Sequence, residues 1–217
     1  MSCPSFRLLA LLGGLALLPA AHASELVVRD LIIDLEFLPA AYDYTLDDGE
    51  TSRSDSDEFD SAIGIAIGGR YSFAGPGDRH GFIVGGELCG AQYGTSDPEG
   101  HLTTYGARVE GGYGFALSDR WTIIGLAEVG YGLATFDVTG GGDFPTFSAD
   151  GTTLTYGAAL GVDFAVTERV LVGVDLGYQV RTIDLSGNGL DIELEQGGLR
   201  AAIGLTYRFS ARPSPLE

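Results

Sequence analysis

Apolar and polar residues alternate along most of the chain after residue 30, and short groups of turn residues interrupt the alternation. Successive residues of an extended strand point to opposite faces, so this alternation predicts strands with one apolar and one polar side. Gly, Pro, Asn and Asp between the alternating stretches are typical of turns. The pattern predicts eight strands, namely Leu31–Thr45, Ser61–Phe73, Gly81–Gly94, Leu102–Leu117, Trp121–Asp137, Thr152–Val166, Val170–Leu185 and Leu190–Phe209.

The predicted connections between these strands alternate in length. Short ones lie at Ala74–His80, Ser118–Arg120 and Thr167–Arg169, whereas those at Leu46–Asp60, Thr95–His101, Val138–Gly151 and Ser186–Gly189 are longer or lead into polar hairpins. Short turns on one side and long loops on the other are the arrangement of outer-membrane barrels. The sequence therefore predicts an all-β fold, an eight-stranded antiparallel up-and-down transmembrane β-barrel with both chain ends on the periplasmic side.

The residue types on the two faces of each strand indicate that the solvent is lipid. In the strand at Val170–Leu185, Val172, Val174 and Leu176 share one face, and Asp175 and Arg181 share the other with glycines. A soluble barrel packs its bulky apolar face inside and covers its outside with long polar side chains. Here the polar face carries the small side chains, as a narrow lumen requires. The alternative is a soluble barrel with an aromatic stripe in its core.

The N-terminus predicts export. Residues 1–23 contain Arg7, an apolar run over Leu8–Leu18 and the small-residue ending Ala21-His22-Ala23, which together are typical of a secretory signal peptide. The run is shorter than the roughly 20 residues that a membrane-spanning helix needs. We therefore expect a signal peptide at 1–23, a barrel at 24–209 and a short C-terminal tail at 210–217.

The composition of the chain restricts the classes of molecule that it can bind. The formal net charge is -18, and all twelve bases are Arg, so a nucleic-acid partner is disfavoured because phosphates require a basic surface. Cys89 is the one cysteine after the signal peptide, which leaves no internal disulfide. We expect no cofactor. His80 and His101 form no recognisable constellation with Ser and Asp, so we expect no enzyme activity.

Charged residues on the polar faces are predicted to fill the lumen, because eight strands enclose little space. They are Asp34, Glu36, Arg70, Glu87, Arg108, Glu110, Glu128, Asp163, Asp175, Arg181, Arg200 and Arg208. Counting through the turns places Glu110 opposite Glu128, Arg108 near Glu87, Asp175 opposite Arg200, and Asp34 and Glu36 near Arg208. The structural hypothesis is a network of ion pairs that plugs the barrel; the functional alternative is a gated path for protons or small ions.

Two predicted surface segments each allow a structural and a functional interpretation. Asp184, Asn188 and Glu195 match the spacing of a calcium loop, but Asn188-Gly189 between alternating runs is also a strong signal for a tight hairpin. The segment Leu46–Asp60 holds seven acids and one base. It is predicted to be a solvated loop; alternatively, it captures divalent cations or polycationic partners at the cell surface.

The last strand carries a family resemblance. Gly204-Leu205-Thr206-Tyr207-Arg208-Phe209 resembles the C-terminal assembly signal of outer-membrane barrels, with Gly204, Tyr207 and Phe209 at the signature positions. With the signal peptide and eight strands, the chain resembles the OmpA/OmpX-type small outer-membrane barrels. The resemblance implies the outer membrane, its lipid and the barrel-assembly machinery as surroundings. It implies a structural or surface-interaction role through acidic extracellular loops; the alternative is a narrow channel or transporter for small solutes or ions.

Overall fold

The computed structural model describes residues 26–74, 79–96, 99–139, 146–187 and 189–209. The predicted signal peptide at 1–23 and the predicted tail at 210–217 lie outside these ranges. The strands are β1 (Leu26–Phe37), β2 (Ala41–Asp47), β3 (Ser52–Glu58), β4 (Ser61–Ala74), β5 (His80–Ser96), β6 (Glu99–Ala116), β7 (Trp121–Val138), β8 (Phe147–Ala165), β9 (Val170–Gly187) and β10 (Leu190–Arg208). Within the described ranges, no helix has the length and apolar character needed to cross a membrane.

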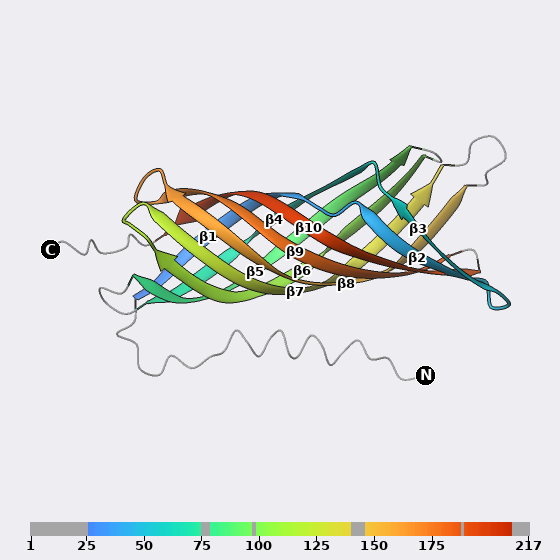
Figure 1. The fold of residues 1–217 in the computed structure, drawn as a ribbon, viewed down its shortest axis with the longest axis horizontal. Coiled ribbons are helices and arrows are strands. Elements are labelled where there is room, and N and C mark those ends of the chain that lie inside the picture. The colour runs from blue at the N-terminus through green and yellow to red at the C-terminus, as the bar shows by residue number, and fades with distance from the viewer. Residues whose placement is uncertain (1–25, 75–78, 97–98, 140–145, 188, 210–217) are drawn as a thin grey trace.

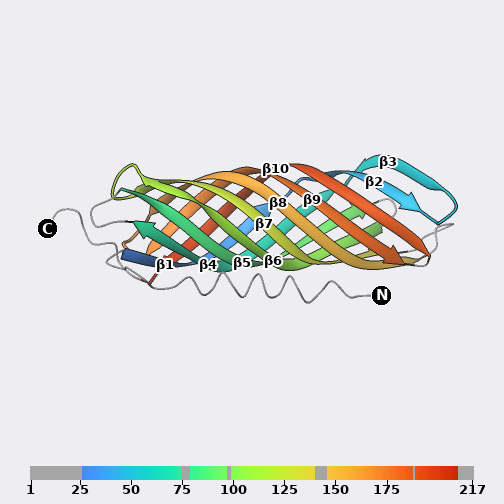
Figure 2. The same ribbon diagram turned by 90° about the horizontal axis from the view of Figure 1, so that it is seen from below.

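Eight strands close into a ring. Strands β4 to β10 follow one another in chain order, each antiparallel to the next, and β1 closes the ring by pairing with both β4 and β10. The strands wind around a common axis (Figures 1 and 2). The predicted eight-stranded up-and-down architecture is therefore confirmed. We call the end of the ring with the turns at Ser118–Arg120 and Thr167–Arg169 the turn end, and the opposite end, where β2 and β3 project, the hairpin end.

The first predicted strand, Leu31–Thr45, is interrupted. Phe37 of β1 lies opposite Ala201, and Tyr42 of β2 lies opposite Gln196, so both strands keep one register along β10. Pro39 falls between them, and proline has no backbone N–H to complete a ladder. Gln196 Nε2 instead donates a hydrogen bond to the Pro39 carbonyl oxygen at 2.5 Å. The wall continues past the break in an unchanged direction.

The prediction of a loop at Leu46–Asp60 is wrong for most of its length, although most of the segment is solvated as predicted. The segment forms the end of β2, a turn and the whole of β3, which pairs with β2 and is exposed at every residue. Gly49 has φ 84°, a left-handed conformation suited to glycine. The backbone amides of Thr51 and Glu50 donate to Asp48 and hold the pKa of its carboxyl below the usual range. Sequence patterning missed β3 because its seven residues are all polar.

The two faces of the wall are divided as predicted. Large apolar side chains on outward positions are exposed on every strand of the ring, for example Leu35, Ile65, Leu88, Tyr105, Val129, Leu160, Leu176 and Ile203. Charged and polar side chains on inward positions are buried, among them Glu36, Arg70, Glu87, Arg108, Glu128, Gln179 and Arg200. An apolar outside around a polar inside is the arrangement that lipid favours and water does not.

Polarity inverts toward the hairpin end. A membrane-spanning strand needs about 9–11 residues, whereas β8 and β10 have 19 each, so both extend beyond a bilayer. In this extension Ile192 and Leu194 of β10 are buried, and Asp191, Glu193 and Glu195 are exposed. The side chains of Ile192 and Leu194 therefore point into the ring in this extension, and the acids between them point outward.

We expect Val174→Arg to destabilise the protein in lipid vesicles by about 2–4 kcal/mol, because Val174 lies outward, half-exposed, in the middle of the apolar band of β9. Thr182→Arg is the matched control, since Thr182 lies on the same face of β9 opposite Glu195. It should have no destabilising effect. Urea unfolding followed by fluorescence of Trp121, the single tryptophan, measures both. Equal losses would show that the outward face is not in hydrocarbon.

Candidate functional site

The lumen is filled in three layers. Near the turn end, Ile83, Ile124 and Leu126 form a small apolar cluster, and Arg208 pairs with Asp30 at 3.2 Å. A connected set of charged side chains occupies the middle. The hairpin end holds a larger apolar cluster, which we call the lumenal apolar cluster: Leu38, Phe59, Ala91, Tyr93, Leu102, Ala134, Ala149, Ile183, Leu185, Ile192 and Leu194.

Arg108 is the centre of the charged layer. Its guanidinium contacts Glu36 at 2.7 Å, Glu87 through Nε at 2.9 Å and Glu128 at 3.5 Å. These three carboxylates come from β1, β5 and β7, so one side chain on β6 ties four strands together. All four residues are buried. Arginine suits this position because its planar fork presents five donors to several acceptors at once.

Arg200 and Arg70 extend the same network around the ring. Arg200 of β10 contacts Glu36 at 2.9 Å and Glu128 at 3.0 Å. Arg70 of β4 forms a bidentate pair with Glu110 and lies 4.0 Å from Glu87. Bidentate arginine–carboxylate pairs are among the strongest hydrogen-bonded contacts in proteins. The pairs run without interruption from β4 through β5, β6, β1 and β10 to β7.

The structure brings together some of the charges as sequence counting predicts. Glu110 and Glu128 are cross-strand neighbours, as are Glu87 and Arg108. The two glutamates do not share a base: Glu110 binds Arg70, and Glu128 binds Arg108 and Arg200. Repulsion between them is therefore offset by different arginines.

Two predicted proximities are wrong. Arg200 lies opposite Gly177, and Asp175 lies opposite Ala202, so the count through Asn188-Gly189 is displaced by two residues. Arg208 pairs with Asp30 rather than with Asp34 or Glu36, because ring closure sets these two residues opposite Gly204 and Ala202. Asp30 was missed because it precedes the first predicted strand by one residue, although it shares the inward parity of Asp34.

Three predicted lumenal acids stand apart from the network. Asp34, Asp163 and Asp175 have no arginine within 4.0 Å among the residues that the structure describes. Glycines on neighbouring strands make room for them: a Cβ on Gly161 or Gly204 would collide with the carboxylate of Asp175 or Asp34. These acids lie on the side of the network toward the turn end.

Aromatic rings connect the projecting hairpin to the lumen. Tyr42 of β2 packs against Phe59 with ring centroids 4.3 Å apart, and Phe59 packs against Tyr93 of β5 at 5.1 Å. Tyr93 is fully buried, and its hydroxyl accepts a hydrogen bond from Arg181 of β9. The lumenal apolar cluster thus covers the charged layer directly. The cavities lined by lumenal residues hold about 20 and 40 Å³, room for a few water molecules.

The outer surface at the hairpin end carries a second concentration of charge, which we call the acidic rim: Asp43, Asp47, Asp184, Asp191, Glu193 and Glu195. All six are exposed. Three cross-strand pairs within it set acids directly opposite one another, Asp184 with Glu193, Glu195 with Asp43, and Asp191 with Asp47. Like charges directly opposite in a sheet are destabilising.

The structure places the calcium-loop candidates in a hairpin. Gly187 pairs with Leu190 across the turn, and Gly189 has φ 81°, which confirms the hairpin interpretation. Asp184 and Glu195 lie outward on β9 and β10, and Asn188 lies outside the described residues. In the described part of the chain, no three His, Cys, Asp or Glu side chains gather as a metal site would require.

A serine, an aspartate and a histidine meet on the outer wall near the hairpin end without forming a catalytic triad. Ser148, Asp137 and His101 lie on adjacent strands β8, β7 and β6. The Ser148 hydroxyl donates directly to Asp137 at 2.7 Å. A triad needs the imidazole between the hydroxyl and the carboxylate, whereas here the carboxylate is in the middle.

At the end of β10, Tyr207 and Phe209 face outward with ring centroids 5.2 Å apart in an edge-to-face arrangement. Gly204 faces the lumen, where it gives space to Asp34. The outward aromatic pair is accessible from the lipid side. Recognition of these residues by the assembly machinery stays a prediction.

A closed antiparallel ring with an apolar outside and a charged, filled inside defines a membrane-embedded β-barrel. The family described as outer membrane protein beta-barrel domain matches residues 8–209, and the chain belongs to this family. The resemblance to small outer-membrane barrels is thereby confirmed, and the apolar wall is the surface that faces lipid. No curated protein sequence matches the chain.

Solved structures agree with this fold. The outer membrane protease OmpT from Escherichia coli is 10% identical, with 84% of this chain and 97% of that chain covered and a TM-score of 0.52. The outer membrane protein OprG from Pseudomonas aeruginosa is 16% identical, with 85% and 97% covered and a TM-score of 0.51. The attachment invasion locus protein Ail of Yersinia pestis is 20% identical, with 83% and 98% covered and a TM-score of 0.40. The likeness to OmpT and OprG concerns the fold alone at these identities.

We expect Arg108→Met to lower the free energy of unfolding by about 3–5 kcal/mol, because it leaves Glu36, Glu87 and Glu128 short of a buried partner. The control is Arg53→Met, which removes the exposed pair of Arg53 with Asp55 at 3.6 Å. Its effect should stay below about 1 kcal/mol. Urea titration in vesicles measures both variants, and a loss for Arg108→Met no greater than the control's would contradict a structural role for the network.

Proposed function

We propose that this protein is a non-conducting outer-membrane barrel that binds cationic partners at the cell surface through its acidic rim. The observation that carries the proposal is the filling of the lumen. An ion-pair network lies beneath the lumenal apolar cluster. The cavities described above between lumenal residues hold only about 20 and 40 Å³, which is too little for a substrate. The outward surfaces are what remains for function.

Orientation follows from the shape of the barrel. Short turns are typical of the periplasmic side and long projecting hairpins of the outside. Under that assignment, β2 and β3 and the acidic rim stand outside the cell (Figure 2). We place the protein in the outer membrane, reached through the predicted signal peptide and assembled with recognition of Gly204, Tyr207 and Phe209.

Charge defines the partner. The acidic rim accumulates like charges on adjacent strands, and a ligand with several positive groups would relieve their repulsion. The carboxylates are spread over β2, β9 and β10 rather than gathered around one point, which favours an extended polycation over a single divalent cation. We therefore propose a basic peptide or protein segment as the partner class.

We also propose that the protein is not an enzyme. The hydroxyl, carboxylate and imidazole on the outer wall are in the wrong order for nucleophilic catalysis. The other described histidine, His80, lies at the turn end, where its Nδ1 is 2.5 Å from the Tyr113 hydroxyl. The two imidazoles are thus at opposite ends of the barrel, remote from each other.

A narrow cation channel is the second candidate, favoured by one observation. Asp34, Asp163 and Asp175 have no ion-pair partner among the described residues and lie in the lumen toward the turn end, where a permeating cation would find partners. The lumenal apolar cluster covers the other end of such a path. Steady conduction would therefore need that cluster to move.

We expect the full-length barrel in planar bilayers to show no steady ionic current at moderate voltage, because charged and apolar layers fill the lumen. Discrete current steps would contradict this, and a change in their cation preference in Asp175→Asn would establish the channel instead. An empty bilayer and a general porin give the lower and upper references.

We expect vesicles bearing the protein to bind an oligo-arginine peptide with an affinity that falls steeply with salt. The triple variant Asp184→Asn, Glu193→Gln, Glu195→Gln should weaken binding at least tenfold, since it neutralises half of the acidic rim. Asp119→Asn, an exposed acid at the turn end, is the control and should bind as the unchanged protein does. Equal binding by the triple variant would overturn the proposed surface.

A further inference from the structure

Arg181 differs from the other lumenal arginines in having no carboxylate partner. Arg70, Arg108, Arg200 and Arg208 each pair with an acid, whereas no carboxylate oxygen of a described residue lies within 4.0 Å of Arg181. Its Nε donates to the Thr155 hydroxyl at 3.2 Å, one Nη donates to the Tyr93 hydroxyl, and the other lies 3.4 Å from the Gln179 amide oxygen. All three acceptors are neutral.

A buried charge in this position needs compensation. Arg181 is 7% exposed, and a guanidinium stays protonated in proteins. Burial of an ion without an opposite charge is costly, and neutral dipoles balance it only in part. The Tyr93 ring, 5.4 Å from the guanidinium carbon, adds a weak cation–π contribution. Of the unpaired lumenal acids, Asp175 precedes Arg181 by six residues on β9. Glu36 attracts Arg181 electrostatically but lies more than 4.0 Å from it.

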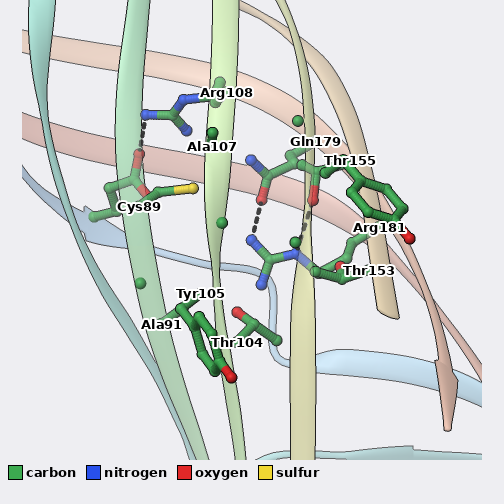
Figure 3. Close-up of a pocket in the computed structure, with 16 residues that line it drawn as sticks. Cys89, Ala91, Thr104, Tyr105, Ala107, Arg108, Thr153, Thr155, Gln179 and Arg181 are labelled. Carbon is green, nitrogen blue, oxygen red and sulfur yellow. Dashed lines mark hydrogen bonds and ion pairs between the residues drawn. The ribbon is translucent and has the colours of Figure 1, made fainter. Parts of the chain in front are cut away.

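A small cavity of about 20 Å³ lies beside this guanidinium. Its walls include Arg181, Thr104, Thr153 and Cys89 from four strands, and Figure 3 shows these side chains around the space between them. Thr153 is 6% exposed, and its hydroxyl has no hydrogen-bond partner among the described residues. A buried, unsatisfied hydroxyl on the wall of a cavity is a free donor for a group inside it.

We propose that this cavity binds one small monovalent anion of halide size. The anion would accept hydrogen bonds from the Thr153 hydroxyl and lie against the Arg181 guanidinium, so that it balances the buried charge. Glu36 also lines the cavity, and its carboxylate is bound by Arg108 at 2.7 Å and by Arg200 at 2.9 Å. A volume of about 20 Å³, room for one or two water molecules, favours a halide over sulfate, phosphate or an organic acid.

This site is independent of the acidic rim. It lies beneath the lumenal apolar cluster, since Tyr93 contacts both Phe59 of that cluster and Arg181. A bound anion would therefore stabilise the folded barrel from inside without contact with the outer surface.

The test uses the full-length protein in detergent micelles, with urea midpoints measured in sodium chloride, sodium bromide and sodium sulfate at matched ionic strength. A ligand that binds only the folded state stabilises it in proportion to the logarithm of its concentration. Sulfate stabilises folded proteins without a binding site, because it is excluded from their surface. The expected signal is therefore a rise of the midpoint that saturates with chloride and bromide, whereas the response to sulfate does not saturate and is the same in Thr153→Val. Crystals grown in bromide should show an anomalous peak between Thr153 Oγ1 and the Arg181 guanidinium.

Thr153→Val keeps the shape of the side chain and removes its donor, and it should weaken halide binding about tenfold or more, as loss of a hydrogen bond to a charged group does. Thr206→Val is the matched control, because Thr206 is another buried lumenal threonine, on the wall of the cavity near the turn end. It should keep the halide dependence. Arg181→Met should abolish it, and if that variant does not fold, Thr153→Val decides.

The proposal is overturned by a midpoint indifferent to halide, by a water molecule only at this position, or by a bromide peak without any solution effect. It is also overturned if Thr153→Val and Thr206→Val respond to halide alike. None of these outcomes alters peptide binding at the acidic rim, so this site and the proposed function fail separately.

Discussion

The buried arginine–carboxylate network is the interaction on which the rest of this barrel depends. Its members lie on strands distant in the sequence, and Arg108 alone joins β6 to β1, β5 and β7. Burial of such pairs adds little net stability, but loss of one partner is expensive. The network therefore mainly disfavours rings in which a strand is missing or misplaced. Its buried charges have partners only when all the contributing strands are in place.

A narrow ring imposes the second constraint. Long charged side chains fit inside because glycine and alanine face them from the neighbouring strands, as Gly161 faces Asp175 and Gly204 faces Asp34. The bulky apolar residues are then left to the outward face, where lipid is their solvent. Beyond the lipid the same strands reverse this order: Ile192 and Leu194 turn inward to the lumenal apolar cluster, and the neighbouring acids face water. One continuous sheet is thus adapted to lipid along part of its length and to water beyond it.

The acidic rim is the feature that folding does not explain. Asp184 opposite Glu193 and Glu195 opposite Asp43 oppose the pairing of the strands that carry them. Backbone pairing and the buried face of β10 maintain the hairpin end in spite of this repulsion. This repulsion supports the binding role that we propose for the acidic rim.

The sequence by itself determined the strands of the ring, their two faces and the local pairs of Glu110 with Glu128 and of Glu87 with Arg108, but not the register between β9 and β10. Alternation in β5 to β10 assigns each side chain to lipid or lumen, and the short turn between β6 and β7 fixes Glu110 opposite Glu128, because a tight connection leaves one register. The polar strand β3 could not be predicted in this way, since nothing in its composition marks a buried face.

Only the tertiary structure decided which charges meet across the ring. Arg208 with Asp30, and Arg200 with Glu36 and Glu128, join residues far apart in the chain, and their proximity depends on ring closure and on the reach of arginine across the lumen. For the same reason the unpaired position of Arg181 was invisible in the sequence. The alternation along a strand determines which way a side chain points. Its partner lies on another strand, and the alternation does not determine where that strand lies in the ring.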